Sequence, residues 1–359
     1  MASLIIPQQK THQSSSLIFS LSDINSFKNL NNDIDHLDYN FDDQEIECIG
    51  SSHGWLAFSQ VKPKNNLYIR NPFSETRFNL PPKHTLPQII NHQLQYTKIN
   101  KLVLCGNPSN GPNYTVIAMH NMWFRTTIAF CRPGDVKWAD LGSNLETCYD
   151  AVCCDTTKTA YVLGPGPIVE GWDMKGPGPI RNMVIDVGCP TKLACAREMF
   201  PSDLYSTQWY LALSESGQLF LAMRYIGEFV RPYDGKVVYE GDTLTDYASE
   251  PLVCPYKTVG FYVFKFDGDG KKWVDVESLG DDCAMFVGGN ESMIVSIKDK
   301  GVKGNAVYFT DDYWDRMNED YSYGGHDNGV FYLGGTIETL WEDQSRILPP
   351  PFWITTPSN

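Results

Sequence analysis

Short apolar runs alternate with polar turns from residue 46 onward. Trp55–Phe58 and Leu67–Arg70 are two such runs on either side of a turn-rich gap, and a third follows an Asn-Pro-Phe-Ser corner at residues 71–74. Short runs joined by tight polar turns are typical of antiparallel strands in a meander. Apolar positions at helical spacing are scarce, and Ala194–Phe200 is the candidate helix. The pattern predicts an all-β fold with little helix.

Two stretches of the chain repeat one another. Lys-Trp-Ala-Asp at residues 137–140 and Lys-Trp-Val-Asp at residues 272–275 both follow a glycine turn, and a Leu-Gly pair follows each. The two tryptophans lie 135 positions apart, which is about three of the ~40–50-residue blades of a β-propeller. We therefore predict a single β-propeller of about six short antiparallel blades over residues 46–355, with tryptophans packed between blades.

Residues 1–45 differ from this pattern. Residues 7–16 are polar, and eleven of the twenty-one positions from Asp23 to Asp43 are Asn or Asp. These side chains compete with the backbone for hydrogen bonds and favour loops. We predict a poorly ordered N-terminal segment at residues 1–45, ahead of the propeller domain at residues 46–355.

The block at residues 50–82 carries an SxHGWL strand at Ser51–Leu56, which leads into an NPF corner and ends in LPP. It resembles the plant F-box-associated β-propeller family, whose members include kinase-inhibiting F-box proteins of brassinosteroid signalling. The resemblance covers most of residues 46–355 and implies a protein-binding propeller rather than an enzyme. Further family-like stretches follow in order at residues 130–141, 210–223, 264–289, 304–312 and 349–355.

The resemblance also implies a role for the domain. In F-box relatives it looks like the substrate-recognition half of an SCF-type ubiquitin ligase, in which the F-box docks a Skp1-like adaptor. An F-box opens with a Leu-Pro pair ahead of apolar helices, and residues 1–45 contain no match to it. We therefore expect a client-binding propeller without its own ligase-docking module and without direct docking of a Skp1-like adaptor. A shaggy-like kinase is a client that the resemblance suggests.

The alternative function is a propeller-fold carbohydrate-active hydrolase that uses acidic residues at the central channel. Residues 50–54 also match G-x-S-x-G, the motif of the nucleophile elbow in hydrolases. That elbow needs a helix after the serine, whereas here Trp55–Phe58 continues as an apolar run. We therefore expect a turn in which Ser52 and His53 cap backbone groups, and we predict no catalytic residues.

The charge of the chain bears on its partners. It has 43 Asp and Glu against 29 Lys and Arg, a formal net charge of −14. Phosphate backbones and anionic membranes attract clustered Lys and Arg, so the sequence argues against nucleic acid and membrane partners. Another protein with a basic surface is the better electrostatic match. A recognisable signal or transit peptide is missing, so we expect a cytoplasmic or nuclear protein.

The sequence predicts neither a cofactor nor a metal. Its ten cysteines contain no CxxC pair, and we expect reduced thiols. The Asp-Gly-Asp-Gly run at residues 267–270 starts like a calcium loop, but Lys271 and Ser278 stand where an EF-hand needs ligands. A hairpin turn is the better interpretation. The seven histidines lack the spacing of a zinc site.

Residues 311–323 are the candidate interaction loop, with four Asp, one Glu and four aromatic residues. Tyr and Trp supply much of the binding energy at protein interfaces, and acidic neighbours would steer a basic partner. The alternative is a solvated loop with some aromatic residues packed into the core. We assign the protein-interaction role to Asp311, Asp312, Tyr313, Trp314, Tyr321 and Tyr323.

Overall fold

Strands make up most of the part of the chain that the computed structural model describes. Helix α1 (Lys192–Met199) lies close to the predicted Ala194–Phe200, and the described residues also include the short 3₁₀ helices η2 (Lys83–Thr85) and η4 (Pro108–Asn110). No described helix is long and apolar enough to cross a membrane. The described residues are 2–10, 13–20, 46–60, 66–87, 97–122, 125–188, 190, 192–231, 234–239, 256–297, 302–313, 316, 325–340 and 351–355.

Three sheets are four-stranded antiparallel meanders with their strands in chain order. The first sheet contains β3 (Ile46–Ser52), β4 (Trp55–Gln60), β5 (Asn66–Arg70) and β6 (Arg77–Leu80). The second contains β7 (Ile99–Cys105), β8 (Thr115–Met122), β9 (Arg125–Cys131) and β10 (Ala139–Asp140). The third contains β11 (Asp150–Cys154), β12 (Thr159–Leu163), β13 (Val169–Asp173) and β14 (Ile180–Ile185). The predicted meander of short strands is confirmed in these sheets.

The fourth meander continues into a larger sheet. It contains β15 (Tyr205–Leu213), β16 (Leu219–Gly227), β17 (Lys257–Asp267) and β18 (Lys272–Asp275). A single parallel pair, Leu213 with Met293, joins β15 to β20, and β19 pairs in parallel with β21. The remaining strands of this nine-stranded sheet are β19 (Cys283–Val287), β20 (Met293–Ser296), β21 (Ala306–Phe309), β22 (Gly329–Tyr332) and β23 (Ile337–Glu338). The blade number stays a prediction, because the fourth meander and strands β19 to β23 form one continuous sheet.

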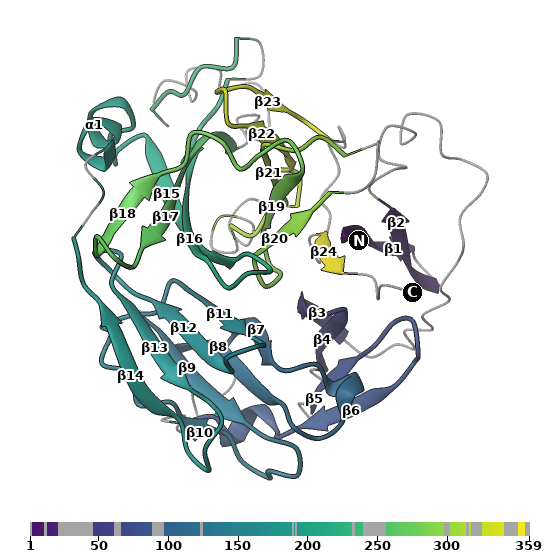
Figure 1. The fold of residues 1–359 in the computed structure, drawn as a ribbon. Helices are drawn as coiled ribbons and strands as arrows, with labels where there is room; N and C mark the ends of the chain where they lie inside the picture. The colour runs from purple at the N-terminus through teal and green to yellow at the C-terminus, as the bar shows by residue number, and fades with distance from the viewer. Residues whose placement is uncertain are drawn as a thin grey trace.

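The two ends of the chain pair with each other. Strands β1 (Ala2–Lys10), β2 (Gln13–Ser20) and β24 (Phe352–Thr355) form a three-stranded sheet in the order β2-β1-β24. Figure 1 shows this sheet beside β3, with the sheets arranged around a ring. The pairing of a C-terminal strand with an N-terminal one joins the two ends of the chain in one sheet of the ring, which leaves fewer open edges.

The sequence predicted a poorly ordered segment at residues 1–45, within which the structure describes strands β1 at residues 2–10 and β2 at residues 13–20. The polar stretch at residues 7–16 is largely strand because it pairs along a hairpin, from Pro7 opposite Ser16 to Lys10 opposite Gln13. The partner β24 is more than 300 positions away in the sequence, so no local pattern could indicate it. Residues 21–45 lie outside the described residues, and the domain boundary at residue 46 stays a prediction.

The repeated tryptophans fill the spaces between neighbouring sheets. Trp138 is buried in a cluster that contains side chains of the first and second sheets, and its indole N–H donates to the Pro81 carbonyl at 2.9 Å. Trp273 is buried in a cluster shared by the third and fourth sheets, with its ring centroid 5.4 Å from that of Phe266. Large aromatic rings between sheets explain why this motif recurs along the chain.

The innermost strands β3, β7, β11 and β15 lie next to one another. On β7 and β11, Cys105 and Cys153 form a disulfide, with their Cα atoms 5.3 Å apart. The sequence predicted reduced thiols, and this pair is the exception, since only the packing of two sheets brings the two residues together. Of the other described cysteines, Cys48, Cys131, Cys148, Cys154, Cys195 and Cys283 are free.

Loss of the Cys105–Cys153 bridge should lower the free energy of unfolding by about 2–4 kcal/mol, because the bridge restricts the unfolded chain between cysteines 48 positions apart. Urea unfolding of the oxidised protein and of the Cys105→Ser variant measures the difference. Cys195→Ser, which removes an exposed free thiol, is the control and should change nothing. Equal values for the oxidised protein and Cys105→Ser would show that the bridge does not stabilise the ring.

Candidate functional site

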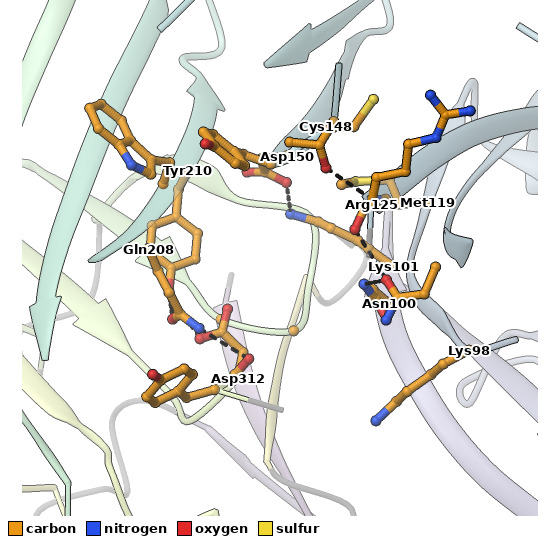
Figure 2. Close-up of a pocket in the computed structure, with 18 of the residues that line it drawn as sticks. Lys98, Asn100, Lys101, Met119, Arg125, Cys148, Asp150, Gln208, Tyr210 and Asp312 are labelled. Carbon is orange, nitrogen blue, oxygen red and sulfur yellow. Dashed lines mark hydrogen bonds and ion pairs between the residues drawn. The ribbon is translucent and has the colours of Figure 1, made fainter. Parts of the chain in front are cut away.

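A cavity of about 650 Å³ lies where β7, β11 and β15 begin and the segment after β21 passes. We call it the Tyr210 cavity. Figure 2 shows its wall, with Lys101, Asp150, Tyr210 and Asp312 facing one another from different elements. The charged and aromatic side chains in its lining are Lys98, Lys101, Arg125, Tyr149, Asp150, Trp209, Tyr210, Asp312 and Tyr313.

Arg224 of β16 lies behind this wall and has no exposed surface. Its Nη1 donates to Asp312 Oδ1 at 3.0 Å and to the Thr310 carbonyl at 2.9 Å. Its Nη2 donates to Asp327 Oδ2 at 2.9 Å, and its Nε donates to Thr258 Oγ1 at 2.7 Å. A planar guanidinium can bind several acceptors at once, and burial of its charge is tolerated only with such partners. Arg224 therefore ties the segments at residues 310–312 and 327 to the fourth sheet.

Asp312 is held in the cavity wall from both sides. The Tyr210 hydroxyl donates to its Oδ1 at 2.9 Å, and the Gln208 amide donates to its main-chain carbonyl at 3.3 Å. Its side chain keeps 12% of its surface exposed. Burial raises the pKa of Asp312 to about 6, and the Arg224 guanidinium opposes this rise. The carboxylate therefore belongs to the wall, with little surface left for a partner.

Asp311 points away from the cavity into the protein and is fully buried. Its Oδ2 accepts hydrogen bonds from the Tyr256 hydroxyl at 2.6 Å and the Gly325 N–H at 2.8 Å. Burial, followed by the neighbouring Asp327 carboxylate, raises the pKa of Asp311. Asp311 and Asp312 thus make their contacts inside the protein. The sequence had suggested that they steer a basic partner.

Tyr313 is half-buried and lines the cavity. Its hydroxyl lies 2.7 Å from Ser206 Oγ and donates to Glu228 Oε1, also at 2.7 Å. Of the predicted interaction residues, the structure thus brings Asp312 and Tyr313 to one cavity, while Trp314, Tyr321 and Tyr323 lie outside the described residues. The protein-interaction role of all six stays a prediction.

A second buried ion pair lines the same cavity. Lys101 of β7 contacts Asp150 of β11 with Nζ and Oδ1 2.5 Å apart, and the two residues are 7% and 2% exposed. Asp150 Oδ2 also accepts the N–H of Leu211 at 2.8 Å, so three inner strands meet at one carboxylate. Burial raises the pKa of Asp150, and Lys101 opposes the rise. Lys101 and Asp150 each stand directly before an apolar run, which can indicate a buried charge that needs a partner. Our sequence interpretation missed this signal.

The mouth of the Tyr210 cavity is aromatic and basic. Tyr149 is 43% exposed, Arg125 is exposed, and Lys98 and Trp209 are partly exposed. Exposed aromatic and arginine side chains around a hollow are typical of protein interfaces. Among the described residues, no group of three or more His, Cys, Asp or Glu side chains is placed to hold a metal ion.

The G-x-S-x-G stretch forms a turn between two strands, β3 and β4, as expected. His53 and Gly54 lie in this turn with φ of +51° and +78°. Ser51 Oγ donates to the Trp353 carbonyl, and Ser52 Oγ donates to Glu291. These hydroxyls link sheets rather than stand exposed at a helix start. The Asp267 turn is also a hairpin, between β17 and β18, with its carboxylate accepting the N–H groups of Asp269 and Gly270.

Asp312→Asn should flatten the dependence of stability on pH. Because the native pKa of Asp312 is about 6 and an unfolded Asp titrates near ~3.9, the native state binds more protons between these values. Asp312 therefore lowers the free energy of unfolding as pH rises through this window, by about 3 kcal/mol in total. Urea unfolding at several pH values checks this.

The wild type should lose stability relative to Asp312→Asn as the pH rises from about 4 to about 7. Asp269→Asn, which changes an exposed carboxylate in a turn, is the control and should parallel the wild type. Parallel curves for the wild type and Asp312→Asn would contradict the raised pKa.

Comparison with known proteins gives the context of this site. The chain matches a family model described as the KIB1-4 beta-propeller over residues 18–332. An Arabidopsis thaliana protein described as an F-box protein is 34% identical over 98 residues, which cover 27% of this chain and 23% of that protein. The match thus spans about a quarter of this relative's length.

Solved structures show only distant similarity. TolB from Acinetobacter baumannii has 10% identity and a TM-score of 0.41, covering 98% of this chain and 66% of that one. The N-terminal domain of Nup159 has 10% identity and a TM-score of 0.32, covering 96% and 75%. A β-fructofuranosidase from Schwanniomyces occidentalis has 9% identity and a TM-score of 0.31, covering 84% and 61%. Similarities at this level carry no functional conclusion.

The family match is much more extensive than the match to the single relative. It begins within β2, ends at the last residue of β22 and includes both ion pairs of the Tyr210 cavity wall. The resemblance that the sequence motifs indicated is confirmed: the chain belongs to the KIB1-4 β-propeller family.

Proposed function

We propose that this protein is a client-binding propeller that holds another protein at the mouth of the Tyr210 cavity. The observation that carries the proposal is the combination at this mouth of exposed Tyr149, exposed Arg125 and partly exposed Trp209 around a hollow of about 650 Å³. Tyrosine and tryptophan bury large areas on binding with little loss of conformational freedom, and arginine is enriched among the residues that dominate binding energy. Family membership and the F-box relative support an interaction domain.

The chemistry of the wall favours binding over catalysis. A glycosidase of the usual kind needs two carboxyl groups at the sugar, one as acid and one as nucleophile or base. Here Asp150 is paired with Lys101 and Asp312 is paired with Arg224. Each carboxylate is tied to a buried cation, so the two do not form the pair of free carboxyl groups that such an enzyme places at a sugar. The hydrolase alternative therefore has less support than the interaction module.

The charges suggest how a client would fit. A basic client surface matches the net charge of −14, while the part that reaches the cavity meets Lys98 and Arg125. We therefore infer a client that is basic overall and inserts an acidic or aromatic side chain at the cavity. A protein kinase is the client class that the family resemblance suggests, in the cytoplasm or nucleus. A Skp1-like adaptor is not expected among the directly bound proteins.

Changing the cavity mouth should release the client. We expect the double variant Tyr149→Ala/Arg125→Ala to capture clients from plant tissue about tenfold or more less efficiently than the wild type, since interface aromatic and arginine residues contribute about 2 kcal/mol or more. Quantitative mass spectrometry of the purified complexes measures the loss. Direct binding of the recovered client by the purified variants confirms it.

The matched control is Tyr239→Ala/Lys236→Ala, which removes an exposed tyrosine and a cation away from this cavity. It should capture clients like the wild type. Recovery of no protein above background, or equal losses with both double variants, would refute the proposed site. Strong recovery of a Skp1-like adaptor would contradict the expected loss of ligase docking.

A further inference from the structure

A second cavity lies at the other end of the inner strands. The Tyr210 cavity is lined by Asp150 of β11 and Tyr210 of β15, whereas this pocket is lined by Cys153 and Leu213 at the far ends of the same strands. Its volume is about 360 Å³. Turns and strand ends from several sheets meet there. We call it the Glu291 pocket.

Two carboxylates and a histidine form one side of this pocket. Glu291 Oε1 accepts the Cys153 N–H at 3.0 Å, and Glu291 Oε2 accepts a hydrogen bond from the Ser52 hydroxyl. The side chain of Glu291 keeps 10% of its surface exposed. His53 Nδ1 lies 3.2 Å from Asp155 Oδ2, and His53 Nε2 lies 3.6 Å from Glu291 Oε2. The His53 imidazole therefore lies between the two carboxylates. Its Nε2 is too far from Glu291 for a hydrogen bond and has no hydrogen-bond partner.

A buried hydroxyl in the same lining is also unpartnered. Ser292 is 3% exposed, lines the pocket, and its Oγ has no hydrogen-bond partner. A buried polar group without a partner is uncommon in a folded protein and calls for a ligand or water. Because Ser292 and Glu291 both line the pocket, it offers a hydroxyl and a carboxylate as acceptors.

The rest of the lining suits a short aliphatic chain. Val152 and Ile294 are buried and Leu213 is partly buried, so apolar surface lies beside the acidic group. A metal ion is a poor fit, since no group of three or more His, Cys, Asp or Glu side chains among the described residues is placed to ligate one. An organic cation with several N–H donors and an alkyl stem matches both the polar and the apolar walls.

We propose that the Glu291 pocket binds a guanidinium group, carried either by a free arginine-like molecule or by an arginine side chain of another protein. The planar group donates to Glu291 and Asp155 and can reach the Ser292 hydroxyl, while its methylene stem lies on Val152, Leu213 and Ile294. Burial raises the pKa of Glu291, and a bound cation would lower it again. This proposal depends on the pocket alone and does not require client binding at the Tyr210 cavity.

Calorimetric titration of the full chain with N-acetyl-arginine amide tests the proposal. The isosteric neutral compound N-acetyl-citrulline amide is the matched control ligand. We expect the arginine compound to bind at millimolar or lower concentration and the citrulline compound to bind at least tenfold more weakly. A short peptide with one internal arginine, against the same peptide with citrulline, distinguishes the two sources of the cation.

Binding of both the free compound and the peptide supports a small molecule as a sufficient ligand, and binding of the peptide alone supports a protein side chain. Glu291→Gln should weaken binding at least tenfold, whereas Glu338→Gln, an exposed carboxylate on β23, should leave it unchanged. If Glu291→Gln fails to fold, Asp155→Asn and Ser292→Ala provide the same comparison. Equal binding of arginine and citrulline compounds, binding unaffected by the pocket variants, or no binding by either probe would overturn the proposal.

Discussion

The buried guanidinium of Arg224 is the constraint on which the described site depends. A charge without exposed surface is stable only if hydrogen bonds and opposite charges replace its water. Two carboxylates, two hydroxyls and two main-chain carbonyls do so here, and they come from segments far apart in the sequence. Once Arg224 is placed on β16, the residues that follow β21 can therefore occupy few positions.

The same principle operates across the Tyr210 cavity. Lys101 and Asp150 form a second buried pair, which connects β7 to β11 and, through the Leu211 N–H, to β15. Two ion pairs thus hold the lining of one hollow in place, while Tyr149 and Arg125 at its mouth are exposed to contacts. At the other end of these strands, His53 Nε2 and Ser292 Oγ have no hydrogen-bond partner. The ring therefore presents a cavity whose carboxylates are paired with buried cations at one end, and a pocket with two unpartnered polar atoms at the other.

The sequence predicted those features that depend on neighbouring residues. Alternation of apolar runs and polar turns identified β4, β5 and β6, and glycine turns before Lys-Trp identified the tryptophans between sheets. Features that depend on distant residues were missed. The pairing of β1 with β24, the Cys105–Cys153 bridge and the parallel pair of β19 with β21 all arise when remote segments meet in the ring.

The candidate site shows the same division. Tyr313 and Asp312 were selected from a local cluster of acidic and aromatic residues, and both line the Tyr210 cavity. Their neighbour Asp311 was selected by the same signal, yet it is buried and accepts a hydrogen bond from Tyr256. The local sequence could not predict this, because Tyr256 lies far from Asp311 in the chain. Tyr149 and Arg125 gave no signal, since an exposed residue at a strand end acquires significance only when a cavity lies beside it.

The measurement that tests the central claim most directly is the unfolding free energy of Arg224→Leu in urea. Removal of this guanidinium leaves Asp312 and Asp327 buried without their cation, so we predict a loss of about 3–5 kcal/mol. Arg231→Leu, which breaks the more exposed pair with Asp234, should cost less than about 1 kcal/mol. Equal and small losses for the two variants would contradict the account.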